Sequence, residues 1–74
     1  MDKANQHQQF SEILEVHKGI IFKIANSYCP NSIDRQDLIQ EILIQIWQSL
    51  HTYNSQYAIT TWLYRVSLNT AISH

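Results

Sequence analysis

Apolar residues recur along this chain at three- and four-residue spacings, which predicts amphipathic α-helices. The first helix is expected from about Phe10 to Tyr28. Residues 1–9 are polar and are expected to form a flexible N-terminal segment before a domain that spans residues 10–74. The apolar side of this helix comprises Phe10, Ile13, Leu14, Ile20, Ile21, Ile24, Ala25 and Tyr28.

A second helix follows the break at residues 29–32, where proline and asparagine interrupt the pattern. Asp34 is the expected N-cap, and Asp37 stands three residues later, as in a capping box. The helix is expected to end near Leu50 or His51. Its predicted core side comprises Leu38, Ile39, Ile42, Leu43, Ile46 and Leu50.

The opposite side of the second helix is polar except at its centre, where an isoleucine stands. It carries Asp37, Gln40, Glu41, Ile44 and Gln48. One interpretation is a solvated face with a single stray apolar residue, which is common in folded proteins. The other is a docking surface for a partner, and the pattern alone leaves both open.

A third helix begins after the loop at residues 51–60, with Thr60 or Thr61 as its expected N-cap. One side of this helix, the expected core contact, carries Leu63, Val66, Ser67 and Thr70. Another side carries Trp62, Arg65, Asn69, Ile72 and Ser73. The three segments together predict an all-α fold, a small bundle of three to four helices.

Composition restricts the classes of function. The chain has 74 residues, which allows one domain, and its lone cysteine, Cys29, cannot form an internal disulfide. No apolar run is long enough to span a membrane and no signal-peptide pattern is present, so we expect a cytoplasmic protein with no membrane partner. The four histidines have no metal-ligand spacing, and one glycine cannot build a phosphate-binding loop. We therefore expect no catalytic residue, metal or cofactor.

Charge argues against a chain that binds nucleic acid by itself. The formal net charge is −1, and the Lys and Arg residues number only five. Phosphate contacts from such residues supply most non-specific affinity for DNA. Any binding of DNA must therefore depend on aromatic and amide contacts, or on the charge of a partner.

Such contacts are available in the loop and on the third helix. Tyr53, Tyr57 and Trp62 supply aromatic planes, and the nearby polar side chains, with which they form the candidate DNA-binding set, are those of Asn54, Gln56, Thr61, Arg65 and Asn69. Stacking contributes roughly 1–3 kcal/mol per unpaired base, and amides can bind an exposed base edge. The alternative is that Trp62 and one tyrosine simply fill the core between the second and third helices.

Two sequence blocks carry a resemblance to a known family. They are DLIQEILIQIW, residues 37–47, and TTWLYRVSLNTAI, residues 60–72. Their order and separation resemble region two of bacterial RNA polymerase sigma factors, most closely the extracytoplasmic-function group. The matching positions are Asp37, Leu38, Ile39, Gln40, Glu41 and Trp47, then Thr61, Trp62, Leu63, Tyr64, Arg65, Val66, Ser67 and Asn69.

The resemblance implies two binding surfaces. Asp37, Gln40 and Glu41 match the helix that binds the clamp coiled coil of the polymerase largest subunit, and helix geometry extends this set to Ile44 and Gln48. The family's loop and following helix melt and read the minus-ten promoter element on the non-template strand.

On the DNA side, Trp62 and Asn69 match the family's Trp and Asn, and Asn69 stands at the position of its flipped-base pocket. Tyr53 stands where a phenylalanine is usual. Ile59 replaces an aromatic residue, for which Tyr57 is a candidate substitute. An anti-sigma factor is a further partner implied by the resemblance.

Other features depart from the family. The basic residues after the Asn-x-Ala stretch and the second DNA-binding domain are missing, so we expect a fragment or a truncated product that does not initiate transcription alone. The competing hypothesis is a small helical protein-interaction module, a decoy for the clamp or for an anti-sigma factor. The low net charge favours the decoy, whereas Tyr53, Trp62 and Asn69 favour promoter recognition.

Overall fold

The computed structural model of the protein describes residues 3–53, 56 and 58–74. Three α-helices and one short 3-10 helix make up the described chain. They are α1 (Lys3–Tyr28), α2 (Ser32–Ser49), η1 (Leu50–Thr52) and α3 (Ile59–Ser73). These residues contain no strand, and the predicted all-α class is confirmed.

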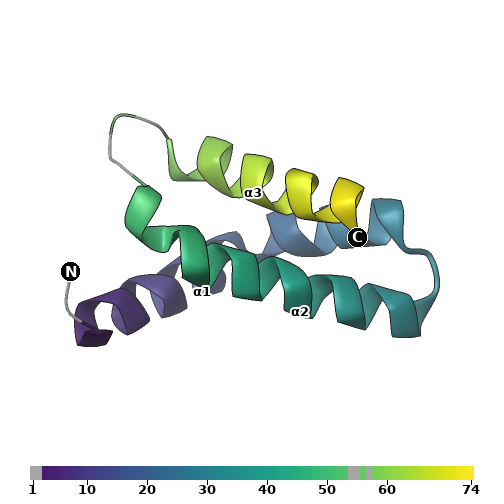
Figure 1. Cartoon of the computed structure of the whole chain (residues 1–74), viewed down its shortest axis with the longest axis horizontal. Coiled ribbons are helices and arrows are strands. Elements are labelled where there is room, and N and C mark those ends of the chain that lie inside the picture. The colour runs from purple at the N-terminus through teal and green to yellow at the C-terminus, as the bar shows by residue number, and fades with distance from the viewer. Residues whose placement is uncertain (1–2, 54–55, 57) are drawn as a thin grey trace.

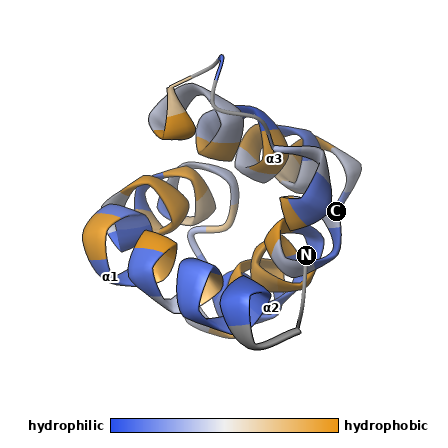
Figure 2. Ribbon diagram, turned by 90° about the vertical axis from the view of Figure 1, so that its left-hand side faces the viewer, coloured by the Kyte–Doolittle hydropathy of each residue, from blue (hydrophilic) through white to orange (hydrophobic). Residues whose placement is uncertain are grey.

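The helices pack as a bundle in which each contacts the other two (Figure 1). α2 runs antiparallel to α1, and α3 runs back in the direction of α1. Figure 2 shows the apolar stretches of the three ribbons turned toward one another. The largest fully buried side chains are Leu38, Ile42, Ile46, Leu50, Leu63 and Ser67. The predicted core side of the second helix is therefore confirmed, with Ile39 and Leu43 half-buried at its edge.

The first helix begins at Lys3 and not near Phe10. The expected start was wrong because contacts between helices, which helical periodicity does not encode, support the early turns. Nε2 of Gln6 donates to the carbonyl oxygen of Trp47 at 3.1 Å, and the Phe10 ring meets the Trp47 ring edge-on at 5.2 Å. The separation of residues 1–9 from the domain stays a prediction.

The N-cap of α2 is Asn31 and not Asp34. Oδ1 of Asn31 accepts hydrogen bonds from the backbone N–H groups of Ile33 at 2.9 Å and Asp34 at 3.3 Å. Arg35 closes the preceding turn, because its Nε donates to the carbonyl of Cys29 at 3.1 Å. Asp34 therefore lies in the first helical turn, where a carboxylate is favoured by the helix dipole.

The N-cap of α3 is Ala58, which makes no side-chain capping bond, so the expectation of Thr60 or Thr61 was also wrong. The N–H of Trp62 already bonds the carbonyl of Ala58 at 3.2 Å, which places both threonines inside the helix. The buried face of α3 consists of Leu63, Ser67 and Ala71, with Val66 and Thr70 half-buried beside it. No helix within the described residues is long and apolar enough to cross a membrane.

Candidate functional site

All five residues predicted on the polar side of α2 are exposed, and Ile44 exposes 52% of its surface among them. Ile33 lies one turn before Asp37 on the same side and is 71% exposed. The sequence pattern missed Ile33 because it placed the N-cap after this residue. We call this surface the α2 stripe, made of Ile33, Asp37, Gln40, Glu41, Ile44 and Gln48.

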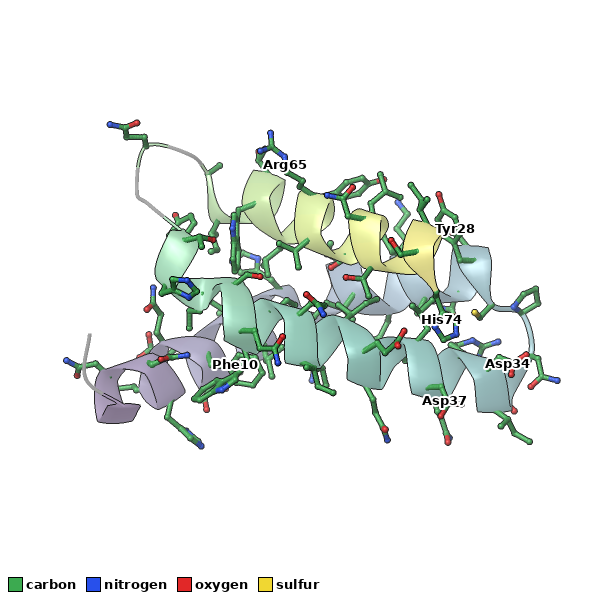
Figure 3. All side chains as sticks on the ribbon, viewed as in Figure 1. Phe10, Tyr28, Asp34, Asp37, Arg65 and His74 are labelled. Carbon is green, nitrogen blue, oxygen red and sulfur yellow. The ribbon has the colours of Figure 1, made fainter. Side chains whose placement is uncertain are left out.

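The two acidic residues of the α2 stripe differ in their surroundings. Asp37 points away from α3 (Figure 3), and it has no capping-box role because the true N-cap lies six positions earlier. Glu41 lies at the edge of the stripe, where its Oε2 is 2.6 Å from Nδ1 of His74 after the end of α3. The stripe therefore contains one outward carboxylate and one that contacts a neighbouring element.

A hollow of about 290 Å³ lies where the end of α2, the η1 turn and α3 meet. Four of the residues predicted to bind DNA line it together, namely Thr61, Trp62, Arg65 and Asn69. We call this site the α3 hollow. Its other lining residues, which sequence reasoning missed, are Ser49, Thr52 and Val66. The helical period had placed Val66 on the core side of the third helix, and the sequence carried no signal that Ser49 and Thr52 approach that helix.

The position of Trp62 is compatible with both roles that the sequence left open. It is half-buried and packs against the core, while it also lines the α3 hollow. Its ring centroid lies 5.4 Å from that of Tyr53, with the two planes tilted by 54°. Arg65 and Asn69 are exposed, and Figure 3 shows Arg65 pointing outward from α3.

The remaining predicted DNA-binding residues are placed less directly. Tyr53 is half-buried and reaches the hollow through its contact with Trp62, since it is not itself a lining residue. Gln56 is exposed in the loop and does not line the hollow. Asn54 and Tyr57 lie outside the described residues.

The chemistry of the α3 hollow suits a planar, polar-edged group. The indole offers a face for stacking, the Asn69 amide offers a donor and an acceptor, and the Arg65 guanidinium offers a positive charge. Hydroxyls of Ser49 and Thr52 add further hydrogen-bonding capacity at the opposite wall. Within the part of the chain that the structure describes, no group of His, Cys, Asp or Glu is arranged to hold a metal ion.

Comparisons with known proteins identify the family of the chain. Residues 13–74 match the family model described as Sigma-70 region 2. The chain is 33% identical to the ECF RNA polymerase sigma-E factor of Escherichia coli (strain K12) over 71 residues, which covers 96% of this chain and 36% of that protein. It is 24% identical to the ECF RNA polymerase sigma factor SigW of Bacillus subtilis (strain 168) over 70 residues, which covers 95% of this chain and 37% of that protein.

These curated relatives are longer, and the chain spans little more than a third of their length. No solved structure matches the chain with comparable significance. The family match covers the α2 stripe, the α3 hollow and most of α1. The chain belongs to the sigma-70 region 2 family and is a region-two domain of the ECF sigma-factor type.

Proposed function

We propose that this domain docks on the RNA polymerase core through the α2 stripe and holds an unpaired base of the minus-ten promoter element in the α3 hollow. The observation that carries the proposal is the convergence of Thr61, Trp62, Arg65 and Asn69 on one hollow. Asp37 and Arg65 point in opposite directions in Figure 3, so both surfaces can be occupied at once. The domain acts as a binding module and not as an enzyme.

The α2 stripe has the composition of a protein interface. Ile33 and Ile44 are large apolar side chains that stay exposed, and amides and carboxylates surround them. Interfaces commonly place such apolar anchors inside a polar rim. Because the stripe carries Asp37 and Glu41 and no basic residue, it favours a partner surface of positive charge. By resemblance to the family, that partner is the clamp coiled coil.

The docking half is tested by replacing Gln40 and Ile44 with alanine. Affinity for the isolated clamp coiled coil should fall by roughly 1–4 kcal/mol in a calorimetric titration, the usual cost of truncating central interface residues. Helicity should stay constant because both residues are exposed. Val16→Ala on α1 is the control, since Val16 is an apolar residue away from the stripe that is 73% exposed, more than Ile44. Equal affinity of the double variant and the control would remove this face from the interface.

The base-capture half follows from the shape and charge of the hollow. A base stacked on Trp62 gains roughly 1–3 kcal/mol, and an amide at Asn69 discriminates among base edges. The hollow should prefer single strands, because extruding a base from a duplex costs a few kcal/mol. With five basic residues in the chain, duplex affinity should be no better than on the order of 10⁻⁴ M at physiological salt.

Base capture is tested with short single strands that differ at one position, titrated at low salt. Asn69→Ala should flatten the preference among bases, whereas Tyr53→Ala should weaken all strands alike because it supports the stacking ring of Trp62. Asn26→Ala, at an exposed position on α1, is the control for removing an amide. If base preference survives Asn69→Ala, the assignment of Asn69 is wrong. A sub-micromolar duplex complex at physiological salt would contradict the charge argument.

A second candidate function is the protein-interaction module without promoter recognition, bound to the clamp or to an anti-sigma factor. It is favoured by a further apolar groove of about 250 Å³ between α1 and α2, where Phe22 stays 46% exposed. The same experiments separate the two functions. Clamp binding together with no base preference in the wild-type chain would select the interaction module.

A further inference from the structure

Residues in the first turns of α1 contact Trp47, near the end of α2. Gln6 donates from Nε2 to the carbonyl oxygen of Trp47 at 3.1 Å. The rings of Phe10 and His7 meet the Trp47 ring edge-on, at 5.2 Å and 5.9 Å between centroids. All three residues that contact Trp47 precede residue 13, where the match to the family model begins.

The carbonyl of Trp47 also lies where α2 ends and η1 begins. The oxygen of Trp47 accepts the backbone N–H of Leu50, which is the C-terminal capping bond of α2. Leu50 in turn accepts the N–H of Tyr53 at 3.1 Å, and the hydroxyl of Thr52 donates to the carbonyl of Ser49 at 2.6 Å. The Gln6 amide therefore binds the first carbonyl of a short hydrogen-bonded series that shapes the turn.

This turn forms one wall of the α3 hollow. Ser49 and Thr52 line the hollow opposite the residues of α3. Tyr53, at the end of the turn, packs its ring against Trp62 at 5.4 Å. A shift of the turn would move both the polar wall and the ring that supports the stacking surface.

We infer that Gln6 and Phe10 are positioning residues for base capture, because they fix the η1 turn against Trp47 and so set the width of the α3 hollow. The inference rests on the proposed function, which makes the hollow the site of the base. If the same contacts had a purely structural role, they would raise the stability of the whole domain. The preference of the folded domain among bases would then not depend on them.

The test uses the whole chain with Gln6→Met, which keeps the length of the side chain and removes its donor. Amide exchange at Tyr53 should quicken by about fivefold relative to Ile42, the loss expected for one hydrogen bond. The preference among bases at one strand position should fall by a similar factor. Gln6→Lys restores an N–H donor and should recover both values. Ile39→Val, a small truncation in the α1–α2 groove, is the control for a general loss of stability.

Each result bears on the inference. An unchanged ratio of exchange between Tyr53 and Ile42 in Gln6→Met overturns it, as does faster exchange with an unchanged base preference. An Ile39→Val control that alters base preference as much as Gln6→Met also overturns it, because the effect would then be one of general stability. If neither the wild-type chain nor Asn69→Ala shows base preference, the proposed function has failed. The positioning role in base capture then fails with it, and the exchange ratio still decides whether α1 holds the turn.

Discussion

The α2 stripe and the α3 hollow are assembled in different ways. Every residue of the stripe belongs to one helix, and their positions follow from a helical repeat of about 3.6 residues. The hollow draws its lining from α2, η1 and α3, so its shape depends on how three elements pack. A surface on one helix persists wherever the helix forms, whereas an assembled hollow requires the tertiary structure to be intact.

The buried faces beneath the two surfaces also differ. The buried residues of α2 are Leu38, Ile42 and Ile46, which are all apolar. α3 buries Ser67 between Leu63 and Ala71, and the Ser67 hydroxyl has no hydrogen-bond partner among the described residues. The buried face of α3, which carries most of the hollow, is therefore less favourable than the buried face of α2, which carries the stripe.

The largest effect should come from Ile42→Ala, which breaks both surfaces. Ile42 is fully buried at the middle of α2, and such truncations lower the free energy of unfolding by about 2–5 kcal/mol. In a domain this small, that loss should remove most thermal stability, measured by circular dichroism. Ile44→Ala is the same change two residues later, on the exposed side. It should alter the free energy of unfolding by less than about 0.5 kcal/mol. Equal losses in the two variants would mean that the faces of α2 are wrongly assigned.

Asn31→Ala should separate the two surfaces. Removing this N-cap should cost about 1 kcal/mol and fray the first turn of α2, which carries Ile33. The hollow lies at the far end of α2 and should keep its base preference. Amide exchange at Ile33 and Asp34, compared with that at Tyr53, measures the difference. Asn31→Asp retains a capping oxygen and should behave as wild type. Loss of base preference in Asn31→Ala, with Asn31→Asp unaffected, would show that the two ends of α2 are coupled.

The helices and their faces were predictable because side-chain periodicity is a local property. Their boundaries were less so, since Asn31 and Ala58 act as caps at positions that compete with nearby Asp and Thr residues. The early start of α1 depends on Trp47, far along the chain, and the repeat within one helix carries no information on that contact.

The candidate site divides in the same way. The stripe was predicted except for Ile33, which the misplaced cap excluded. Four residues of the hollow were predicted as DNA-binding residues on the second sequence block, and the structure brings them to one hollow; their role in binding stays a prediction. Ser49, at the end of α2, and Thr52, in η1, were missed because only the packing of these elements against α3 brings them to the hollow, and that packing has no local signature.

Ser67→Ala should stabilise the packing of α3 on the core, which is the less favourable of the two buried faces. It removes a buried hydroxyl that has no partner among the described residues and replaces serine with a better helix former. We expect the free energy of unfolding to rise by about 0.5–1 kcal/mol in chemical denaturation, with base preference unchanged. Ser67→Val is the contrasting variant, because added volume at a fully buried position should lower stability. A loss of stability in Ser67→Ala would indicate that the hydroxyl makes a favourable contact.

The smallest effect is expected where the α2 stripe and α3 touch, at the 2.6 Å contact between Glu41 and His74. Both groups are partly exposed, and such pairs contribute about 0–1 kcal/mol because water and salt screen them. His74→Ala should therefore change the free energy of unfolding by less than about 0.5 kcal/mol and leave base preference intact. A double-mutant cycle with Glu41→Gln, repeated at high salt, measures the coupling directly. A coupling well above about 1 kcal/mol that persists in salt would mean that the stripe and α3 are energetically linked, and the two surfaces could not then be treated as independent.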